Sequence, residues 1–583
     1  MALIRSSSSS TPISIDKFLG LNMNETGDTQ LQLGESGNMV NFRITKNYKL
    51  EKMYGYKEIY AVNGKIRAQW KGKLGDKEVH IFVAGGKVYN GNEEIGEIRD
   101  NITSIFEFNQ KLYFLNGFEY KAYDGTELKE VEGYVPLVKI SATPEGEGPK
   151  HEQENLLTGK KRQRFSADGV AKEFVLLESN VTSIDSIKVN GVETEATKDL
   201  ANGKVTFANV VEKGVDNVEI QWTKGTGERE HIVKNLYFQK YGLANDTRVL
   251  LYGNVEEKNR TYFSDLGNEV ANVEYFPGNN FIDVGSSNTA ITDMNRQYDR
   301  LIISKENETY YASYDTITDT TRAEIITFPV YPLNSAHGMV AYGQGQLLDN
   351  YVTTIDSSIV MWTNTNTKDE RNVEIISQKI QEWLNSKDLS KAITLDYQED
   401  KEYWLAIGNE IMIYNYGNGT FYLIKIGANI TSLISSEGII YLGTENGQIM
   451  QFGKELMTYN GEVIDAVWNS GYHDLGAEQV RKTMRMLWLT LKPHSKTSLD
   501  INYITDRNSG TNAKNVSNRC IDYNNWNYAD MTYNTQRSVK PYRIKLKAKK
   551  FAFLKLVISN NKIDEQLTIN SLVIKSNYGG EVK

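Results

Sequence analysis

Apolar and polar residues alternate along much of this chain in short runs separated by polar turns, which is typical of β-strands. Three segments of 24 residues align without a gap: residues 102–125, 291–314 and 430–453. Each opens with Ile-Thr and continues through a polar turn, an apolar triplet, a second polar turn and a further strand. A strand that is apolar on both faces lies between stacked sheets, so the pattern predicts a repeated strand–turn–strand unit.

Further copies of this unit extend the repeat along the chain. Residues 66–91 and 393–417 fit with small insertions, and two divergent copies begin near Asn235 and Met339. Sequential copies are spaced by about one four-stranded propeller blade, and radial stacking of such blades buries both faces of each sheet. The chain is therefore predicted to be all-β, with a β-propeller of about seven blades over residues 55–160 and 229–458. Six or eight blades are alternatives to seven. The simpler alternative to a propeller is a set of unrelated β-meanders.

One helix is expected within the repeats. In the run NVEIISQKIQEWLNS, Ile376, Ile380, Trp383 and Leu384 recur at the spacing of one apolar helical stripe. We expect this helix to pack across a blade edge through the stripe.

The segment of residues 161–228 breaks the repeat and reads as an inserted β-sandwich. Apolar and polar residues alternate in it, and the pairs Asn190-Gly191 and Asn202-Gly203 are typical of hairpin turns. Its flanks are rich in glycine and charged residues, as linkers are.

Longer strands follow the repeats and predict a C-terminal β-sandwich over residues 459–583. The expected strands cover residues 484–492, 498–506, 542–550, 551–559 and 568–576. Residues 1–54 are expected to form an N-terminal arm and the first strands, with the serine run 6–10 ordering only on assembly.

The run YRIKLKAKK contains the candidate functional residues. A strand here would place its apolar residues on one face, and its other face would be basic. That basic face would contain Arg543, Lys545, Lys547 and Lys549. One interpretation is an ordinary solvated face, and the other is a surface that docks on an acidic partner.

Charge and composition narrow the classes of function. Hydrophobic residues make up 40% of the chain, enough to build a core, and the net charge of −8 argues against a general nucleic-acid binder. Cys520 is the single cysteine, so no intrachain disulfide is possible. No apolar run approaches the ~20 residues that span a bilayer, and no secretion signal is apparent, so we expect synthesis in a cytoplasm.

The stretch YFSDLGNEVANVEYFPGNNFIDVG, residues 262–285, is the best candidate for catalysis. A glycoside hydrolase presents carboxylates on such a turn, and so does any solvated β-loop; the four here are Asp265, Glu269, Glu274 and Asp283. The spacing of Ser264 and Asp265 does not match the repeated Asp-box of sialidase-type propellers, and no two histidines have metal-ligand spacing. We therefore predict no catalytic, metal or cofactor site and no enzymatic activity.

Residues 260–314 resemble a family of phage virion β-propellers. The likeness rests on the turn Tyr262-Phe263-Ser264-Asp265, the strand Phe281-Ile282-Asp283-Val284-Gly285 and the run Tyr298-Asp299-Arg300-Leu301-Ile302-Ile303. Residues 18–59 are similar to the openings of such proteins, and the insertion resembles their immunoglobulin-like additions. Members of the family form tail hubs, tail nozzles and head–tail connectors of short-tailed phages.

This resemblance implies a virion protein made in the cytoplasm of a bacterial host. It implies a homo-oligomeric ring, expected to be a hexamer, that extends the DNA channel below the portal and adaptor. The ring would retain packaged DNA, contact it transiently, mediate its ejection and bind other tail or fibre proteins. The alternative is a carbohydrate-binding or glycan-cleaving propeller that recognises a receptor.

Overall fold

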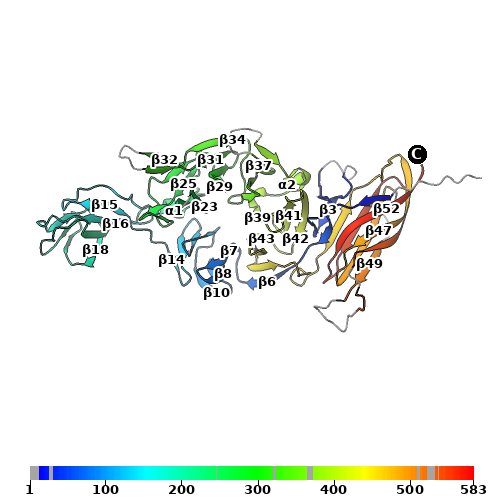
Figure 1. Ribbon diagram of the computed structural model, residues 1–583, viewed down its shortest axis with the longest axis horizontal. Coiled ribbons are helices and arrows are strands. Elements are labelled where there is room, and N and C mark those ends of the chain that lie inside the picture. Colours follow the sequence, from blue (N-terminus) through cyan, green and yellow to red (C-terminus); the bar gives the residue numbers. More distant parts are fainter. Residues whose placement is uncertain are drawn as a thin grey trace, which may run out of the picture. The chain divides into compact units, whose positions relative to one another are not determined.

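A computed structural model describes residues 12–24, 31–243, 246–318, 324–363, 372–507, 513–521, 532–535 and 538–582. The serine run 6–10 lies outside these residues. In the described residues strands dominate (Figure 1), and the helical segments are limited to α1 (Glu230–Val233), η2 (Gln378–Ile380), α2 (Gln381–Asn385) and η3 (Leu389–Lys391). The all-β prediction is therefore confirmed.

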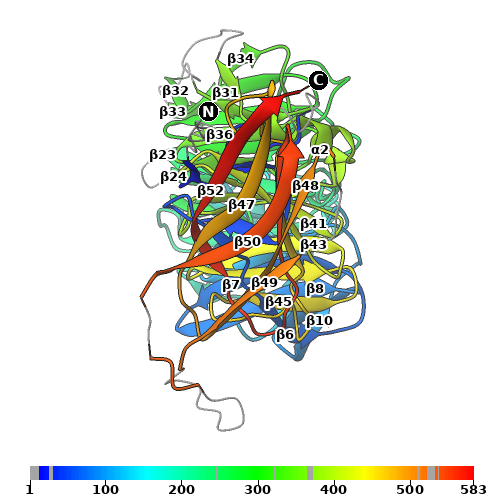
Figure 2. The same ribbon diagram turned by 90° about the vertical axis from the view of Figure 1, so that its right-hand side faces the viewer.

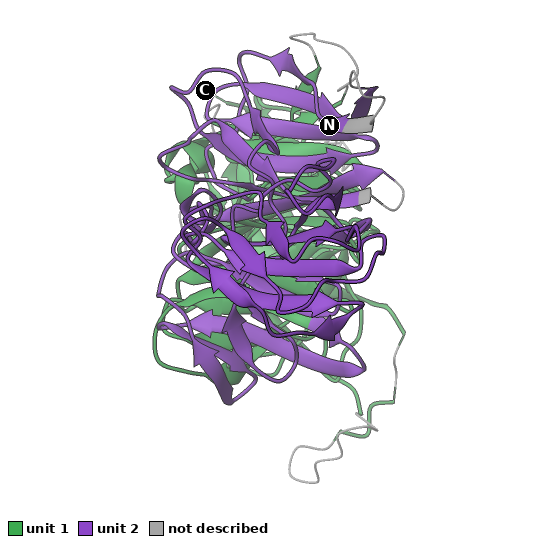
Figure 3. Cartoon of the chain, turned by 90° about the vertical axis from the view of Figure 1, so that its left-hand side faces the viewer, with its two compact units in different colours: residues 1–71, 344–364, 371–583 green, residues 72–343, 365–370 purple. Residues whose placement is uncertain are grey.

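The chain forms two compact units (Figure 3). One comprises residues 1–71, 344–364 and 371–583, and the other comprises residues 72–343 and 365–370. We call them the first and the second unit. The chain first passes from the first unit to the second within the strand β7 (Ile66–Leu74).

The second unit contains a series of four-stranded antiparallel sheets, each built mainly from consecutive strands. In the first of them, β8 (Lys77–Ala84), β9 (Lys87–Asn90) and β10 (Glu93–Glu97) follow β7. The next contains β11 (Ser104–Phe108), β12 (Lys111–Leu115), β13 (Tyr120–Tyr123) and β14 (Leu128–Glu130). Two more follow the insertion: β23 (Tyr237–Leu243), β24 (Asp246–Tyr252), β25 (Arg260–Phe263) and β28 (Phe281–Asp283), then β29 (Ile291–Gln297), β30 (Arg300–Lys305), β31 (Thr309–Ser313) and β34 (Val330–Asn334). Two short hairpins extend from them: β26 (Asp265–Gly267) with β27 (Val270–Asn272), and β32 (Asp315–Thr318) with β33 (Glu324–Thr327).

The insertion in the second unit has two sheets around a core of its own. The larger sheet comprises β15 (Leu137–Ala142), β16 (Lys160–Phe165), β22 (Val218–Thr223), β18 (Ser183–Val189) and β19 (Val192–Glu193). The smaller comprises β17 (Glu173–Val175), β21 (Lys204–Thr206) and β20 (Thr197–Asp199). Phe165, Phe174, Val205 and Trp222 from both sheets are buried in one cluster. The larger sheet also includes β15, so the insertion begins before residue 161, where the sequence predicted its start.

The first unit contains three further groups of four strands. They are β35 (Gln346–Leu348), β36 (Tyr351–Ile355), β37 (Ile359–Trp362) and β38 (Val373–Ile375); β39 (Ile393–Tyr397), β40 (Glu402–Ile407), β41 (Glu410–Asn415) and β42 (Thr420–Lys425); and β43 (Ile430–Ser436), β44 (Ile439–Thr444) and β45 (Gln448–Phe452) with β6 (Tyr56–Ala61). The strand β6 comes from the start of the chain and pairs with β45, so this last group combines segments that are far apart in the sequence.

The C-terminal segment builds two sheets together with strands from the N-terminal segment. One has the order β4 (Phe42–Ile44), β5 (Leu50–Lys52), β52 (Thr568–Glu581), β47 (Val480–Leu491) and β50 (Lys540–Phe551), and β1 (Pro12–Ile15) also pairs with β52. The other has the order β3 (Glu35–Val40), β46 (Ala466–Ser470), β51 (Leu554–Asn560), β48 (Lys496–Thr505) and β49 (Lys514–Arg519), and β2 (Gly20–Leu21) pairs with β3. The first strands predicted within residues 1–54 are thus β1 to β5, and they complete the C-terminal sheets.

The second of these sheets continues into the group β39–β42. Val40 of β3 pairs with Leu423 of β42, and the main-chain amide of Asn41 donates to the carbonyl of Leu423. One sheet of ten strands results, with β49 at one end and β39 at the other. Hydrogen-bonded strands therefore join the repeats of the first unit to its C-terminal sheets.

The predicted repeats match the observed sheets closely, whereas the predicted helix does not. Six of the seven predicted copies supply three consecutive strands of a four-stranded group, and the copy at residues 235–254 supplies two, β23 and β24. The helix expected over NVEIISQKIQEWLNS is wrong in its first half, where β38 pairs with β37 and helical structure begins only at Gln378. Ile380, Trp383 and Leu384 are buried as predicted, but Ile376 lies between strand and helix and is only half-buried.

Candidate functional site

The four carboxylates of residues 262–285 do not form a common site. Asp265 pairs with the buried Arg248 at 2.6 Å, and Asp283 takes two hydrogen bonds from Arg260 at 2.8 and 2.9 Å. Glu274 accepts from the hydroxyl of Tyr113, whereas Glu269 is exposed. Each bound carboxylate therefore has its own structural partner.

The serine–aspartate turn has a structural role that follows from its hydrogen bonds. Ser264 is buried, and its hydroxyl oxygen accepts from the main-chain amide of Val249 on the neighbouring strand at 3.0 Å. Asp265 also accepts from the amide of Leu266 and from the side chain of Asn280. Ser264 lies between β25 and β26, so these side chains hold the connection between two strands.

Among the described residues, no group of three or more His, Cys, Asp or Glu side chains is arranged to hold a metal ion. No described helix is long and apolar enough to cross a membrane.

The basic residues of β50 lie as the sequence pattern predicted. Ile544, Leu546 and Ala548 are buried, whereas their neighbours on the opposite face are exposed: Arg543, Lys545, Lys547 and Lys549. Since β50 alternates strictly over this stretch, the four cations form one row along the outer face of its sheet.

In this sheet β47 lies between β50 and β52 (Figure 2), and both β47 and β52 add residues to the face. Met486 of β47 lies between Lys545 of β50 and Lys575 of β52, since it pairs with both. Trp488 lies in the same way between Arg543 and Val573. Arg485 is exposed next to Met486. We call this surface the basic face, and it comprises Arg485, Met486, Trp488, Arg543, Lys545, Lys547, Lys549, Val573 and Lys575.

The cations of the basic face have no acidic partner in the part of the chain that the structure describes. Arg543 directs its Nε at the sulfur of Met486 at 2.8 Å, and no ion pair joins it or the other five cations to a described carboxylate. Elsewhere in the C-terminal sheets ion pairs do form, as between Arg481 and Asp506 at 3.0 Å. The basic face is thus an uncompensated positive surface.

The open edge of β50 is poorly suited to accept another strand. Pro541 has no amide hydrogen to donate, and the register with β47 shifts between Met484 and Met486. The carbonyl of Lys547 accepts from the hydroxyl of Tyr503 at 3.0 Å, so this group is already satisfied. Proline, lysine and irregular pairing are the devices that protect sheet edges. A partner would therefore approach the outer face of the sheet.

The C-terminal segment differs in charge from the rest of the chain. Residues 459–583 contain 19 Lys and Arg against 11 Asp and Glu, a net charge of +8, whereas the whole chain has −8. Residues 1–458 therefore carry −16. Long-range attraction would favour contact between the basic face and an acidic surface.

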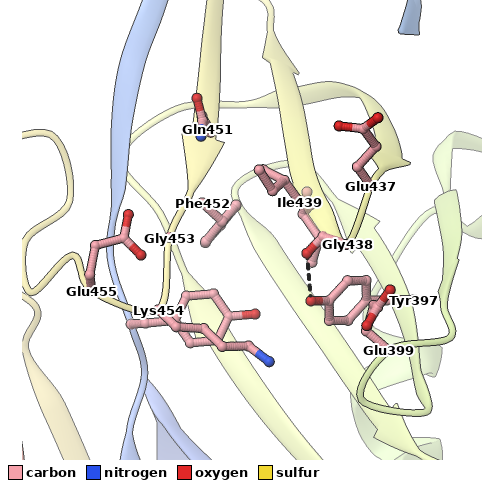
Figure 4. A pocket seen from close by; sticks show the side chains of 12 residues that line it. Tyr397, Glu399, Glu437, Gly438, Ile439, Gln451, Phe452, Gly453, Lys454 and Glu455 are labelled. Atoms are coloured by element: carbon pink, nitrogen blue, oxygen red, sulfur yellow. Dashed lines mark hydrogen bonds between the residues drawn. The ribbon is translucent and has the colours of Figure 1, made fainter. Parts of the chain in front are cut away.

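A pocket in the first unit is a second candidate (Figure 4). Its volume is about 340 Å³, and its lining combines aromatic side chains with carboxylates: Tyr54, Tyr397, Phe452, Glu399, Glu437 and Glu455. The hydroxyl of Tyr397 donates to the carbonyl of Gly438 at 2.8 Å, and Lys454 pairs with Asp400 at 2.8 Å. Aromatic rings beside carboxylates are a common lining of sites for polar ligands.

Comparison with known proteins identifies no family for this chain. No family model matches it, and no curated protein does. Solved structures that match include the computationally designed Ika8 protein (11% identity, 68% of this chain and 99% of that chain, TM-score 0.33) and BamB from Moraxella catarrhalis (10% identity, 68% and 97%, TM-score 0.31). The AfRom2 CNH domain matches with 8% identity over 69% of this chain and 99% of that chain, at a TM-score of 0.36. These likenesses are too distant to bear on function.

The sequence identified the row of cations but not the centre of the basic face. Met486 and Trp488 stand in the run MRMLWLTLK, where only strand formation was predicted. The signal was present, since both residues occupy the half-exposed phase of that strand. Their position between β50 and β52 depends on strand order, which periodicity does not determine.

Proposed function

We propose that this chain is a structural subunit of a phage particle, a ring-forming tail hub, tail nozzle or neck protein without enzymatic activity. It would extend the DNA channel below the portal and adaptor, help retain packaged DNA and mediate its ejection. The sequence resemblance of residues 260–314 supports this assignment, as does an all-β chain with many rigid sheets available for assembly.

The architecture that we propose is a seven-bladed propeller with an immunoglobulin-like insertion and a C-terminal sandwich. Six four-stranded sheets and the group β39–β42 would be the blades. The strand β6, which pairs with β45, would join the two ends of the repeat region within one blade. A blade that combines strands from the start and the end of the repeat region closes the ring of blades.

The single observation that carries the assembly function is the uncompensated basic face. Six exposed cations without a described acidic partner surround an apolar centre, Met486 and Trp488. Trp, Met and Arg are enriched at interfaces between proteins, and the rims of interfaces are polar. The sheet that carries the basic face also contains β1, β4 and β5, so six hydrogen-bonded strands fix the backbone beneath it.

The experiment is to replace the protein in particles by the double variant Lys545→Glu, Lys547→Glu and to determine its incorporation by mass spectrometry and cryo-electron microscopy. We expect incorporation to be impaired, because reversed charges would oppose an acidic neighbour. Lys65→Glu with Lys77→Glu is a matched control, since both lysines are exposed and the change in net charge is identical. Normal incorporation of the first variant would contradict the assembly role of the basic face.

The pocket of Figure 4 favours a second candidate, a receptor-binding protein that recognises glycans. Tyr54 and Phe452 would offer rings to a sugar, and the carboxylates would accept from its hydroxyl groups. A glycan array probed with the purified chain, and then with Tyr54→Ala, tests this candidate. Binding by an isolated chain that never enters a particle would overturn the structural assignment.

A further inference from the structure

We propose that the pocket of Figure 4 binds a linear aliphatic polyamine, a molecule whose ammonium groups are joined by methylene segments. The whole lining of this pocket belongs to the first unit. None of its residues belongs to the basic face, so the inference goes beyond the proposed function and does not rest on it.

Two neighbouring groups of strands build the pocket from their turns and strand ends. Tyr397 ends β39, Phe452 ends β45, and Gly438 lies in the turn between β43 and β44. The hydroxyl group of Tyr397 donates to the carbonyl of Gly438 at 2.8 Å and so joins the two groups. Tyr54, from the connection between β5 and β6, completes the aromatic part of the lining.

Three carboxylates of the pocket have no positive partner. Glu399, Glu437 and Glu455 are exposed, and no ion pair or hydrogen bond joins their carboxylates to a residue that the structure describes. The cation in the lining, Lys454, is already engaged, because its Nζ pairs with Asp400 at 2.8 Å. The pocket therefore presents uncompensated negative charge, which attracts a cationic ligand.

A buried tyrosine of the pocket also lacks a hydrogen-bond partner. Tyr54 is only 8% exposed, yet its hydroxyl group forms no hydrogen bond with any described part of the chain. Burial raises the pKa of Tyr54 well above its usual range, so this hydroxyl group stays protonated and its oxygen can accept. Buried polar groups normally have a partner. An ammonium group of a ligand would supply the missing donor.

The separation of the carboxylates favours an extended ligand over a single ion. Figure 4 shows Glu455 on one side of the pocket and Glu399 and Glu437 on the other. Phe452 and Ile439 lie between these two sides. Among the described side chains, no three or more His, Cys, Asp or Glu are arranged to hold a metal ion. A polyamine can place ammonium groups against the carboxylates on both sides and methylene groups against the apolar residues between them.

Isothermal titration calorimetry of the purified full chain with spermidine tests the inference. We expect saturable binding that weakens as the salt concentration rises, because salt screens the attraction between exposed charges. Putrescine has two ammonium groups and should bind less tightly than spermidine, and butylamine, which has one, should bind less tightly still.

Variants separate the pocket from charge elsewhere on the chain. Glu437→Gln with Glu455→Gln removes two charges from the rim and should raise the Kd for spermidine about tenfold. Glu93→Gln with Glu97→Gln is the matched control, because both carboxylates are exposed on β10 of the second unit and the net charge changes equally. This control should leave the Kd unchanged. Tyr54→Phe removes only the hydroxyl group and should weaken binding by a smaller factor.

Several results would overturn the inference. They are no binding of spermidine, equal weakening by the control and by the pocket variant, or equally tight binding of Mg²⁺, which would indicate diffuse attraction alone. Tighter binding of a trilysine peptide than of spermidine would assign the pocket to a basic segment of another protein, and binding of a neutral oligosaccharide without spermidine would assign it to glycans.

The inference and the proposed function fail independently. If spermidine does not bind but the chain is incorporated into particles, the inference falls and the structural assignment stands. If spermidine binds as expected and the chain is absent from particles, the structural assignment falls instead.

Discussion

Arg43 of β4 and Glu402 of β40 form a buried ion pair between residues 359 positions apart in the chain. Arg43 Nη2 lies 3.2 Å from Glu402 Oε1 and 3.2 Å from Asp400 Oδ2, and the carboxyl group of Glu402 also accepts from Tyr422 and Trp404. Burial raises the pKa of Glu402, and Arg43 opposes that rise. This pair ties the N-terminal strands to the repeats of the first unit.

Removing Arg43 should destabilise the first unit strongly. Arg43→Met leaves Glu402 buried without its cation, and breaking a buried pair in this way costs about 3–5 kcal/mol. Urea unfolding of the full chain would show a lower midpoint. The double variant Arg43→Met, Glu402→Gln should recover part of the loss, because the amide oxygen can still accept from Tyr422. Equal losses in both variants would contradict the role of the unpaired charge.

Glu410 should make the first unit less stable at acidic pH. Burial alone would raise its pKa, but Lys387, Lys425 and Trp383 lower it from 4.5 to about 2. A folded-state pKa below the unfolded value stabilises the fold above about pH 4.5, and this contribution disappears as the pH falls towards 2.

The expected contribution of Glu410 is on the order of 2–3 kcal/mol at neutral pH. Glu410→Gln should therefore lower the free energy of unfolding at pH 7 and flatten its decline in acid. Chemical denaturation at a series of pH values measures both effects. If the free energy of unfolding of the variant falls as steeply with decreasing pH as that of the wild type, Glu410 is not the source of the acid sensitivity.

Ser264→Ala should cost about 1–3 kcal/mol, because it leaves the buried amide of Val249 without an acceptor. The control is Ser287→Ala, which changes an exposed serine and should alter the free energy of unfolding by less than about 0.5 kcal/mol. Thermal unfolding of the two variants side by side makes the comparison. Similar midpoints for both would show that the hydroxyl group of Ser264 does not support the turn.

Reversing charges on the basic face should leave the C-terminal sheets folded. Lys545→Glu with Lys547→Glu changes exposed side chains, so each should alter the free energy of unfolding by less than about 0.5 kcal/mol. Leu546→Ala, between them and buried, should cost about 2–5 kcal/mol. Circular dichroism and urea unfolding of both variants test the distinction, which matters because assembly defects are interpretable only in a folded protein.

The periodicity of the sequence predicted the local structure well where one rule dominated. The alternation of β50 correctly placed Ile544 inside and Lys545 outside, because successive side chains of a strand point to opposite faces. It failed at Ile376, where a helical stripe and a strand compete over a few residues. There the pairing of β38 with β37 decided the outcome.

The sequence by itself determined an all-β chain, the positions of its repeats and the row of cations at Arg543, Lys545, Lys547 and Lys549, since these depend on spacing alone. Tertiary structure decided which distant strands pair: β6 with β45, β1 and β5 with β52, and β3 with β42. The pairing of β47 with both β50 and β52 places Met486 and Trp488 between those two strands, and the tertiary fold also brings Arg43 beside Glu402. The physical reason is that hydrogen bonding between strands follows the best burial of the whole chain, which no local window contains.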